Sequence, residues 1–155
     1  MNHASTKSRV NSGDAAVTGL FSGIAGGLVM ILFLMAAGLA TGSAPVVVLG
    51  HFDPTGDGNP LSGILAHLAI SSVYGVVYGI VWRVLSQTGR KQAPGWMTGL
   101  LFSLALYAIA RLVFLTAGNI SLLSIPAWQL LMAHLGYGLG LGWVFERSLQ
   151  REPAN

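Results

Sequence analysis

Two stretches of the chain, "AHLAISSVYGVVYGIVWR" at residues 66–83 and "AHLGYGLGLGWVFER" at residues 133–147, contain the same motifs in the same order. Each begins with Ala-His-Leu, continues with a Tyr-Gly pair and further glycines, and ends with an aromatic residue followed by a charged one. Both are largely apolar, as helices that cross a membrane are. Each therefore places a histidine inside a predicted membrane-crossing helix.

The composition also favours a membrane protein. Of the 155 residues, 53% are hydrophobic and only 8% are charged, whereas a soluble domain carries about 25% charged residues. The 21 glycines suit helices that pack closely within lipid. The chain contains no cysteine, which excludes disulfides, thiolate metal sites and cysteine nucleophiles.

Four segments reach the roughly 20 apolar residues that a helix needs to cross a hydrocarbon core. They cover about residues 15–40, 60–85, 96–117 and 126–145. The sequence therefore predicts an all-α fold, an integral membrane four-helix bundle within residues 15–147. Cytoplasmic tails are predicted at residues 1–14 and 148–155.

The basic residues predict the orientation. Lysine and arginine precede the first segment, lie between the second and third, and follow the fourth, while the loops at about 41–59 and 118–125 contain neither. By the positive-inside rule, both termini are cytoplasmic. This predicts a multi-pass protein surrounded by the lipid bilayer.

The bundle is predicted to be a duplicated hairpin. Thr-Gly-Leu occurs at residues 18–20 and again at 98–100. The second and fourth segments share a proline, Ala-His-Leu and Tyr-Gly in the same order. Two parallel repeats, about 15–85 and 96–147, would be related by an axis along the membrane normal. Each repeat is then expected to place its histidine at the same level.

Glycines recur at every fourth position of the predicted helices, where they share one helix face. Such spacing lets two helix backbones approach closely in lipid, so we interpret these faces as packing surfaces. The residues are Gly19, Gly23 and Gly27, then Gly75 and Gly79, and finally Gly136 with Gly140 and Gly138 with Gly142.

Three ionisable residues lie within the predicted spans: His67, Arg111 and His134. At 1.5 Å per residue, each is roughly 10–12 Å from the outer end of its helix. Tyr74 and Tyr137 follow the histidines on the same helical stripes. Polar residues in spans face the protein interior and seek partners, so these five residues are the candidate cofactor-binding site.

Four roles remain open for this site, and one of them is a transport path or a metal site. The two histidines could hydrogen-bond to each other across the bundle and fix the helix register. They could instead ligate haem b as a bis-histidine pair. Alternatively, they and the tyrosines could bind a quinone or a lipid, with Arg111 binding an anionic or carbonyl group. Arg111 could also extend to the outer headgroups, or pair with Asp53 or Asp57.

The sequence contains no motif that points to an enzyme. No Asp or Glu lies within a predicted span, and no catalytic set, metal-ligand spacing or phosphate loop occurs. The loop "GHFDPTGDGNP" at residues 50–60 has alternate calcium-loop positions, but Ile64 stands where a bidentate Glu is expected. We therefore interpret this loop as a turn that caps the second helix through Asn59. The basic residues are too scattered for nucleic-acid binding.

These observations predict a non-catalytic accessory or assembly subunit without a cofactor, packed against other membrane protein subunits or against itself. The alternative function is a haem b- or quinone-binding electron-transfer subunit, which would use the candidate site described above.

The segments Gly23–Met35 and His134–Phe145 resemble a group of uncharacterised bacterial membrane proteins, a domain family of unknown function. Those proteins have a first helix of the form GxxxGGxVMxxxLM and a last helix close to HLxYGxxLGxVY. The resemblance implies four spans and a bacterial inner-membrane location, and it transfers no activity. This chain departs from the pattern by ending it with Phe145–Glu146.

Overall fold

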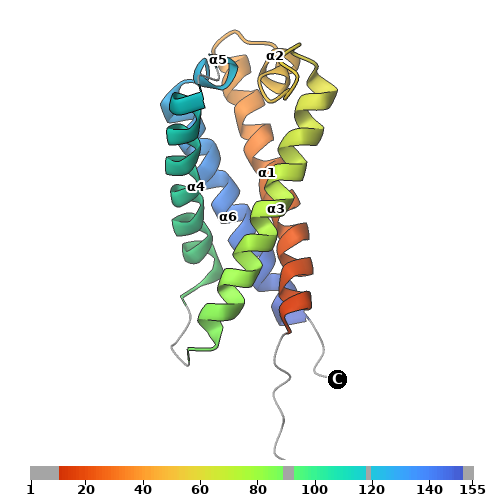
Figure 1. Ribbon diagram of the computed structural model, residues 1–155, viewed down its shortest axis with the longest axis vertical. Coiled ribbons are helices and arrows are strands. Elements are labelled where there is room, and N and C mark those ends of the chain that lie inside the picture. Colours follow the sequence, from red (N-terminus) through yellow and green to blue (C-terminus); the bar gives the residue numbers. More distant parts are fainter. Residues whose placement is uncertain (1–10, 89–92, 118–119, 152–155) are drawn as a thin grey trace, which may run out of the picture.

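The computed structural model describes residues 11–88, 93–117 and 120–151, and every regular element within these ranges is an α-helix (Figure 1). This confirms the predicted all-helical fold. Two helices are short, α2 (Pro45–Gly50) and α5 (Ile120–Leu123). The long helices are α1 (Ser12–Ala40), α3 (Pro60–Ser86), α4 (Gly95–Ala117) and α6 (Ala127–Arg151).

Within the described ranges, three helices are long and apolar enough to cross a membrane: α1, α3 and the Gly95–Val113 part of α4. The fourth predicted span forms α6, which is as long as the others but is not one of the three. Its lower hydropathy follows from its many glycines and from polar residues such as Gln129 and His134.

The structure differs from the sequence prediction in two loops. The segments predicted as loops at 41–59 and 118–125 contain α2 and α5. Helix α6 ends at Arg151, within the segment predicted as a cytoplasmic tail from residue 148. The side chain of Glu146 joins α6 to the start of α4. Its carboxylate accepts a hydrogen bond from the backbone N–H of Gly95 at 3.0 Å, so it caps the first turn of α4.

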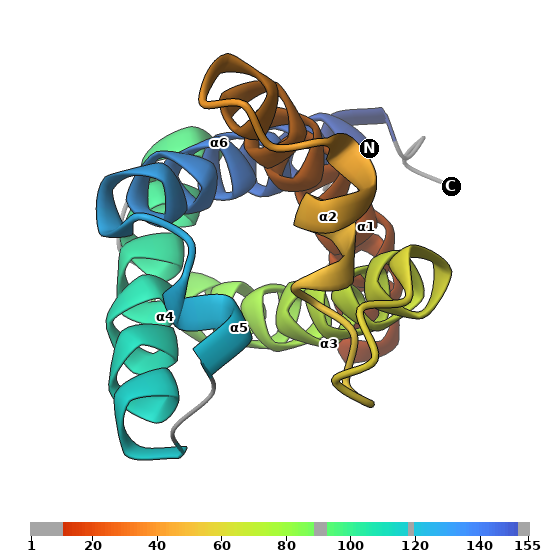
Figure 2. The ribbon, with the colours of Figure 1, turned by 90° about the horizontal axis from the view of Figure 1, so that it is seen from above.

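The long helices are arranged in the order α3, α1, α6, α4, because α1 packs against α3 and α6, and α4 packs against α6. Seen from above, these four helices surround a central region (Figure 2). The start of α1, the end of α3, the start of α4 and the end of α6 lie at one end of the molecule (Figure 1). The short helices α2 and α5 lie at the other end, which we call the outer end.

Glycines allow α1 and α3 to touch backbone to backbone. A Cβ atom added at Gly19 would collide with the carbonyl oxygen of Gly75, and one added at Gly79 would collide with that of Ala15. A Cβ at Gly27 would lie 2.7 Å from the side chain of Ser71. The predicted packing role of these glycines is therefore confirmed for this helix pair.

The fourth-position glycines of α6 form two different faces. Gly138 and Gly142 face α4, where an added Cβ would meet the backbone oxygens of Gly99 and Gly95 respectively. Gly136 faces α1 more loosely, since its added Cβ would meet only Val29, at 3.4 Å. One helix thereby joins α1 to α4.

An aromatic cluster joins α3, α4 and α6 at the end of the molecule opposite α2 and α5. Tyr78 packs against Phe102 and Phe145, with ring centroids 5.4 and 5.2 Å apart, and Trp82 packs on the other side of Phe145. The Tyr78 hydroxyl also hydrogen-bonds to the hydroxyl of Thr98 at 2.6 Å. These contacts hold α3 and α4 together at this end.

The loop between α2 and α3 is organised by the buried carboxylate of Asp53. It accepts hydrogen bonds from the hydroxyl of Ser62, the N–H of Asn59, and both the hydroxyl and the N–H of Thr55. Led by the Ser62 hydroxyl, these donors hold the pKa of Asp53 well below its usual range. The Asn59 side chain accepts from the N–H groups of Leu61 and Ser62, which confirms its predicted capping role.

Gly138→Ala is expected to destabilise the protein by about 1–3 kcal/mol, because the added methyl group collides with the α4 backbone. Gly136→Ala on the same helix is the matched control and should change stability far less. The thermal unfolding midpoint in detergent measures both. Equal midpoints for the two variants would contradict the close contact between α6 and α4.

Asp53→Asn is expected to loosen the loop between α2 and α3, seen as faster backbone hydrogen exchange at residues 53–62, whereas Asp57→Asn should not. Because the pKa of Asp53 is lowered on folding, its contribution is present above the unfolded value of about 3.9. That contribution is lost only as the pH falls through the lower folded value. Loop exchange corrected for intrinsic rates should therefore be constant from about pH 5 to 8, and loosening near pH 5 would contradict this assignment.

Candidate functional site

A cavity of about 200 Å³ lies between the four long helices, near the outer end. Met30 of α1 and Leu130 of α6 line it, together with Phe52, which follows α2, and Leu122 of α5. Further lining residues come from α3, α4 and α6: His67, Ile70, Ser71, Tyr74, Leu106, Ile109, Ala110, Val113, His134 and Tyr137. None of these described residues carries a fixed charge, so the cavity suits a neutral ligand.

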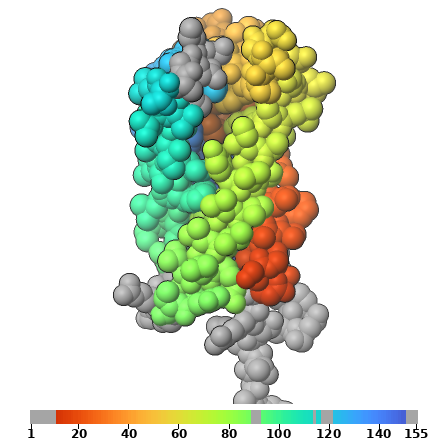
Figure 3. Space-filling model, in the orientation of Figure 1, coloured from red at the N-terminus to blue at the C-terminus, as the bar shows by residue number. Residues whose placement is uncertain are grey.

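The cavity opens on the side of the molecule, between α3 and α4. Its lining includes Ile70 and Tyr74 on α3 and Ile109 and Val113 on α4, and all four side chains are also exposed on the surface. The space-filling view shows the surface hollowed between these two helices (Figure 3). A ligand could thus enter from the apolar flank of the molecule.

His67 reaches across from α3 to α1. Its ring is buried, packs edge-on against Phe52 with centroids 4.9 Å apart, and places Nε2 3.1 Å from the backbone oxygen of Gly27. A carbonyl oxygen only accepts hydrogen bonds, so Nε2 carries the proton. In the neutral ring, Nδ1 then keeps its lone pair.

His134 uses the opposite nitrogen. Its Nδ1 donates to the backbone oxygen of Leu130, one turn earlier in α6, at 2.8 Å. Nε2 of the neutral ring therefore carries the lone pair. The ring is buried beside Tyr107, with centroids 5.6 Å apart.

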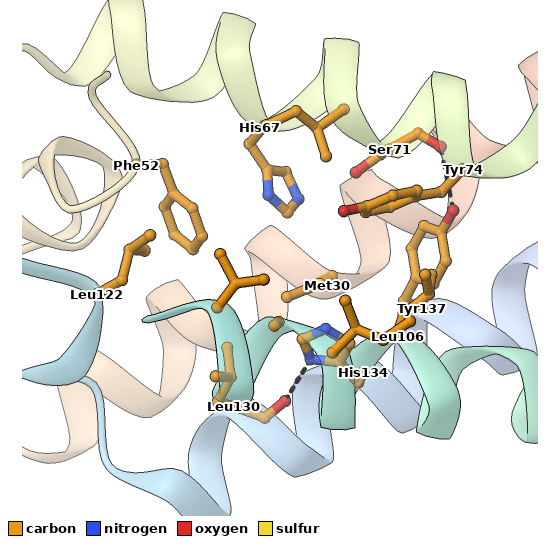
Figure 4. A pocket seen from close by; sticks show the side chains of 14 residues that line it. Met30, Phe52, His67, Ser71, Tyr74, Leu106, Leu122, Leu130, His134 and Tyr137 are labelled. Carbon is orange, nitrogen blue, oxygen red and sulfur yellow. Dashed lines mark hydrogen bonds between the residues drawn. The ribbon is translucent and has the colours of Figure 1, made fainter. Parts of the chain in front are cut away.

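The two histidines point into the cavity from opposite sides (Figure 4). They form no hydrogen bond with each other among the described residues; each is bound to a backbone oxygen instead. The nitrogens that carry the lone pairs are Nδ1 of His67 and Nε2 of His134. Neither is among the fully buried side-chain atoms that lack a hydrogen-bond partner. Both nitrogens are thus accessible from the cavity.

Tyr137 and Tyr74, the two tyrosines of the candidate site, also line the cavity, with different roles. Tyr137 is buried, and its hydroxyl donates to the backbone oxygen of Ser71 at 3.0 Å, which ties α6 to α3. Tyr74 is partly exposed at the side opening. The structure therefore brings four of the five candidate residues together around one space.

Arg111 is the candidate residue that the structure does not place in the cavity lining. Ile109, Ala110 and Val113, its neighbours in the sequence, line the cavity. Arg111 itself lies on another face of α4. Within the part of the chain that the structure describes, it forms no ion pair with Asp53 or Asp57.

The apolar lining residues, above all Met30, Phe52 and Ala110, could not be recognised from the sequence. Nothing in the sequence separates an apolar side chain that lines an internal cavity from one that faces lipid. The backbone oxygen of Gly27 was missed as well. Its signal is indirect: a glycine there lets α3 approach so closely that His67 reaches α1.

The arrangement defines a class of protein: an all-helical chain with membrane-length helices and a neutral cavity, open on its side, that presents two imidazole nitrogens. The chain belongs to a family of unknown function, DUF6789, whose model matches residues 13–155. No curated protein and no solved structure matched the chain in the comparisons.

We predict that His67 and His134 are neutral in opposite tautomers, since their protonated nitrogens differ. In ¹⁵N NMR spectra of histidine-labelled protein at pH 7.5, Nδ1 of His67 and Nε2 of His134 should show the shift of an unprotonated ring nitrogen. The signals can be assigned by their loss in His67→Asn and His134→Asn. Finding both rings in one tautomer would contradict the hydrogen bonds described above.

Proposed function

We propose that the protein crosses a bacterial inner membrane four times, with both termini on the cytoplasmic side. The exposed apolar side chains on α1, α3 and α4 support the placement of these helices in lipid. The orientation is supported by the basic residues Arg83 and Arg147, which lie near the end of the molecule where α1 begins and α6 ends. The acidic residues Asp53 and Asp57 lie at the outer end, with α2.

We propose further that the two helix pairs derive from one duplicated hairpin. The backbone contact of Gly19 with Gly75 recurs as that of Gly99 with Gly138. The contact of Ala15 with Gly79 recurs as that of Gly95 with Gly142. In both contacts, the residue numbers of the two pairs differ by 80 on the first helix and by 63 on the second. One packing geometry therefore accounts for both pairs.

This packing register revises the expected equivalence of the histidines. A shift of 63 positions makes Ser71 the counterpart of His134, and Leu130 the counterpart of His67. The two histidines are therefore one helical turn apart between the repeats, not at equivalent positions. All four residues line the cavity, which makes it an asymmetric site between two similar halves.

The function that the geometry supports best is binding of a lipid-soluble molecule with a single-ring headgroup, of the quinone class. The observation that carries this proposal is the neutral cavity that opens on the apolar flank between α3 and α4. Its volume of about 200 Å³ exceeds the roughly 150 Å³ of a cavity known to bind benzene. The ring would lie inside, and its apolar tail would leave through the side opening.

The size of the cavity does not favour haem b, because a porphyrin joins four pyrrole rings and exceeds a single-ring space. The role of accessory or assembly subunit, in contact with other membrane proteins or a second copy, stays a prediction from the sequence.

Ala110→Phe is expected to abolish ligand binding or weaken it at least about tenfold, because the ring would fill the cavity next to its opening. Ala108→Phe on the same helix is the matched control, since Ala108 is exposed and does not line the cavity. Calorimetric titration of protein in lipid nanodiscs with an alkyl-substituted quinone and its hydroquinone measures both variants.

The proposed function predicts saturable binding of at least one of these two probes to the unmodified protein and to Ala108→Phe. Binding of neither probe to the folded protein, or equal binding by Ala110→Phe and Ala108→Phe, would contradict it.

A further inference from the structure

The cavity presents two hydrogen-bond acceptors that the protein itself does not satisfy. The N–H of His67 is bound to Gly27 and the N–H of His134 to Leu130. The remaining lone pairs, on Nδ1 of His67 and Nε2 of His134, have no hydrogen-bond donor among the described residues. Both groups lie in a largely apolar space, where a polar group without a partner costs free energy.

These tautomers cannot be exchanged at little cost. Moving the proton of His67 to Nδ1 would place the Nε2 lone pair 3.1 Å from the lone pairs of the Gly27 oxygen. The same change in His134 would oppose two acceptors at 2.8 Å. Each backbone oxygen therefore keeps the proton of its histidine on the side away from the cavity, and both rings remain acceptors toward a ligand.

The other polar groups of the cavity do not supply the missing donors. The Tyr137 hydroxyl already donates to the backbone oxygen of Ser71. The hydroxyls of Ser71 and Tyr74 can each donate or accept, and no hydrogen bond joins either of them to a histidine among the described residues. The two histidine lone pairs thus act only as acceptors toward a ligand, whereas no described group in the cavity acts only as a donor toward it.

We infer, resting on the proposed function, that the cavity selects a neutral ring that donates hydrogen bonds, a phenol or hydroquinone rather than the quinone. The ring lies between His67 and His134, and its hydroxyl groups donate to Nδ1 of the first and Nε2 of the second. A quinone carries only acceptor oxygens, which would face both lone pairs without a proton between them. No electron transfer is part of this inference.

A series of three ligands tests this selection on the unmodified protein. The hydroquinone, its quinone and its dimethyl ether carry the same ring and the same alkyl chain, and only the first has donors. Their dissociation constants are measured by anaerobic calorimetric titration of the full chain in lipid nanodiscs. The hydroquinone should bind about tenfold tighter than either of the others, the effect of two net hydrogen bonds.

Two variants identify the acceptors. His134→Phe keeps a ring but removes the acceptor, so it should reduce the preference for hydroquinone over dimethyl ether several-fold. Ala108→Phe is the control, because Ala108 lies on α4 but does not line the cavity, and it should keep the preference. Loss of the preference in Ala108→Phe but not in His134→Phe would overturn the assignment.

The outcomes separate the two proposals. Equal binding of hydroquinone and dimethyl ether, or tighter binding of the quinone, would overturn the donor selection while leaving a ligand-binding protein. Binding of none of the three ligands would contradict the proposed function itself. The ligand series needs no substitution, so it remains decisive even if a histidine variant fails to fold.

Discussion

The structure depends on direct backbone contact between glycine-bearing helices. Where Gly19 meets Gly75, and where Gly99 meets Gly138, the backbones are so close that an added Cβ would collide with a carbonyl oxygen. Lipid gives helices no hydrophobic reason to associate, so close van der Waals contact of this kind has to hold them together. The contact binds α1 to α3 and α4 to α6. The packing of α6 against α1 joins the two pairs, and there a Cβ added at Gly26 would lie 2.8 Å from the backbone oxygen of Tyr137. Among the described residues, no such glycine contact joins α3 to α4 near the outer end, and the cavity opens between these two helices.

The same packing explains why two histidines can be buried among apolar helices. A buried N–H group needs an acceptor, and each ring finds one in a backbone oxygen already engaged in a helix, that of Gly27 or of Leu130. A carbonyl oxygen has two lone pairs, so it can accept this second bond. An imidazole has two nitrogens, however, and a carbonyl satisfies only the protonated one. The helices therefore fix the tautomers and leave one acceptor of each ring to the cavity.

Much of the fold could be predicted from the sequence, because long apolar runs and fourth-position glycines have few other interpretations. The starts of α1, α3, α4 and α6 lie within a few residues of their predicted positions. The short helices α2 and α5 were missed, since a helix of one or two turns carries no periodic pattern. The hydrogen bond of Glu146 with Gly95 could not be predicted, because it is a tertiary contact between residues 51 positions apart. The polar residues of the site could be predicted, because histidines and tyrosines stand out within predicted spans. Its apolar lining residues could not, because in the sequence they do not differ from residues that face lipid.

If the two helix pairs derive from one duplicated hairpin, as proposed, the departure of the two copies from each other is the feature that gives the site its chemistry. If both halves carried the histidine at the same turn, the two rings would be related by the axis of the repeat and would present the same nitrogen. In the packing register described here, His67 and His134 stand one turn apart, and they use opposite nitrogens for their backbone bonds. Two acceptors thus face one space from opposite sides (Figure 4). A flat ring with a polar group at each end can meet both when it lies between the helices, whereas a ligand with one polar end can meet only one of them.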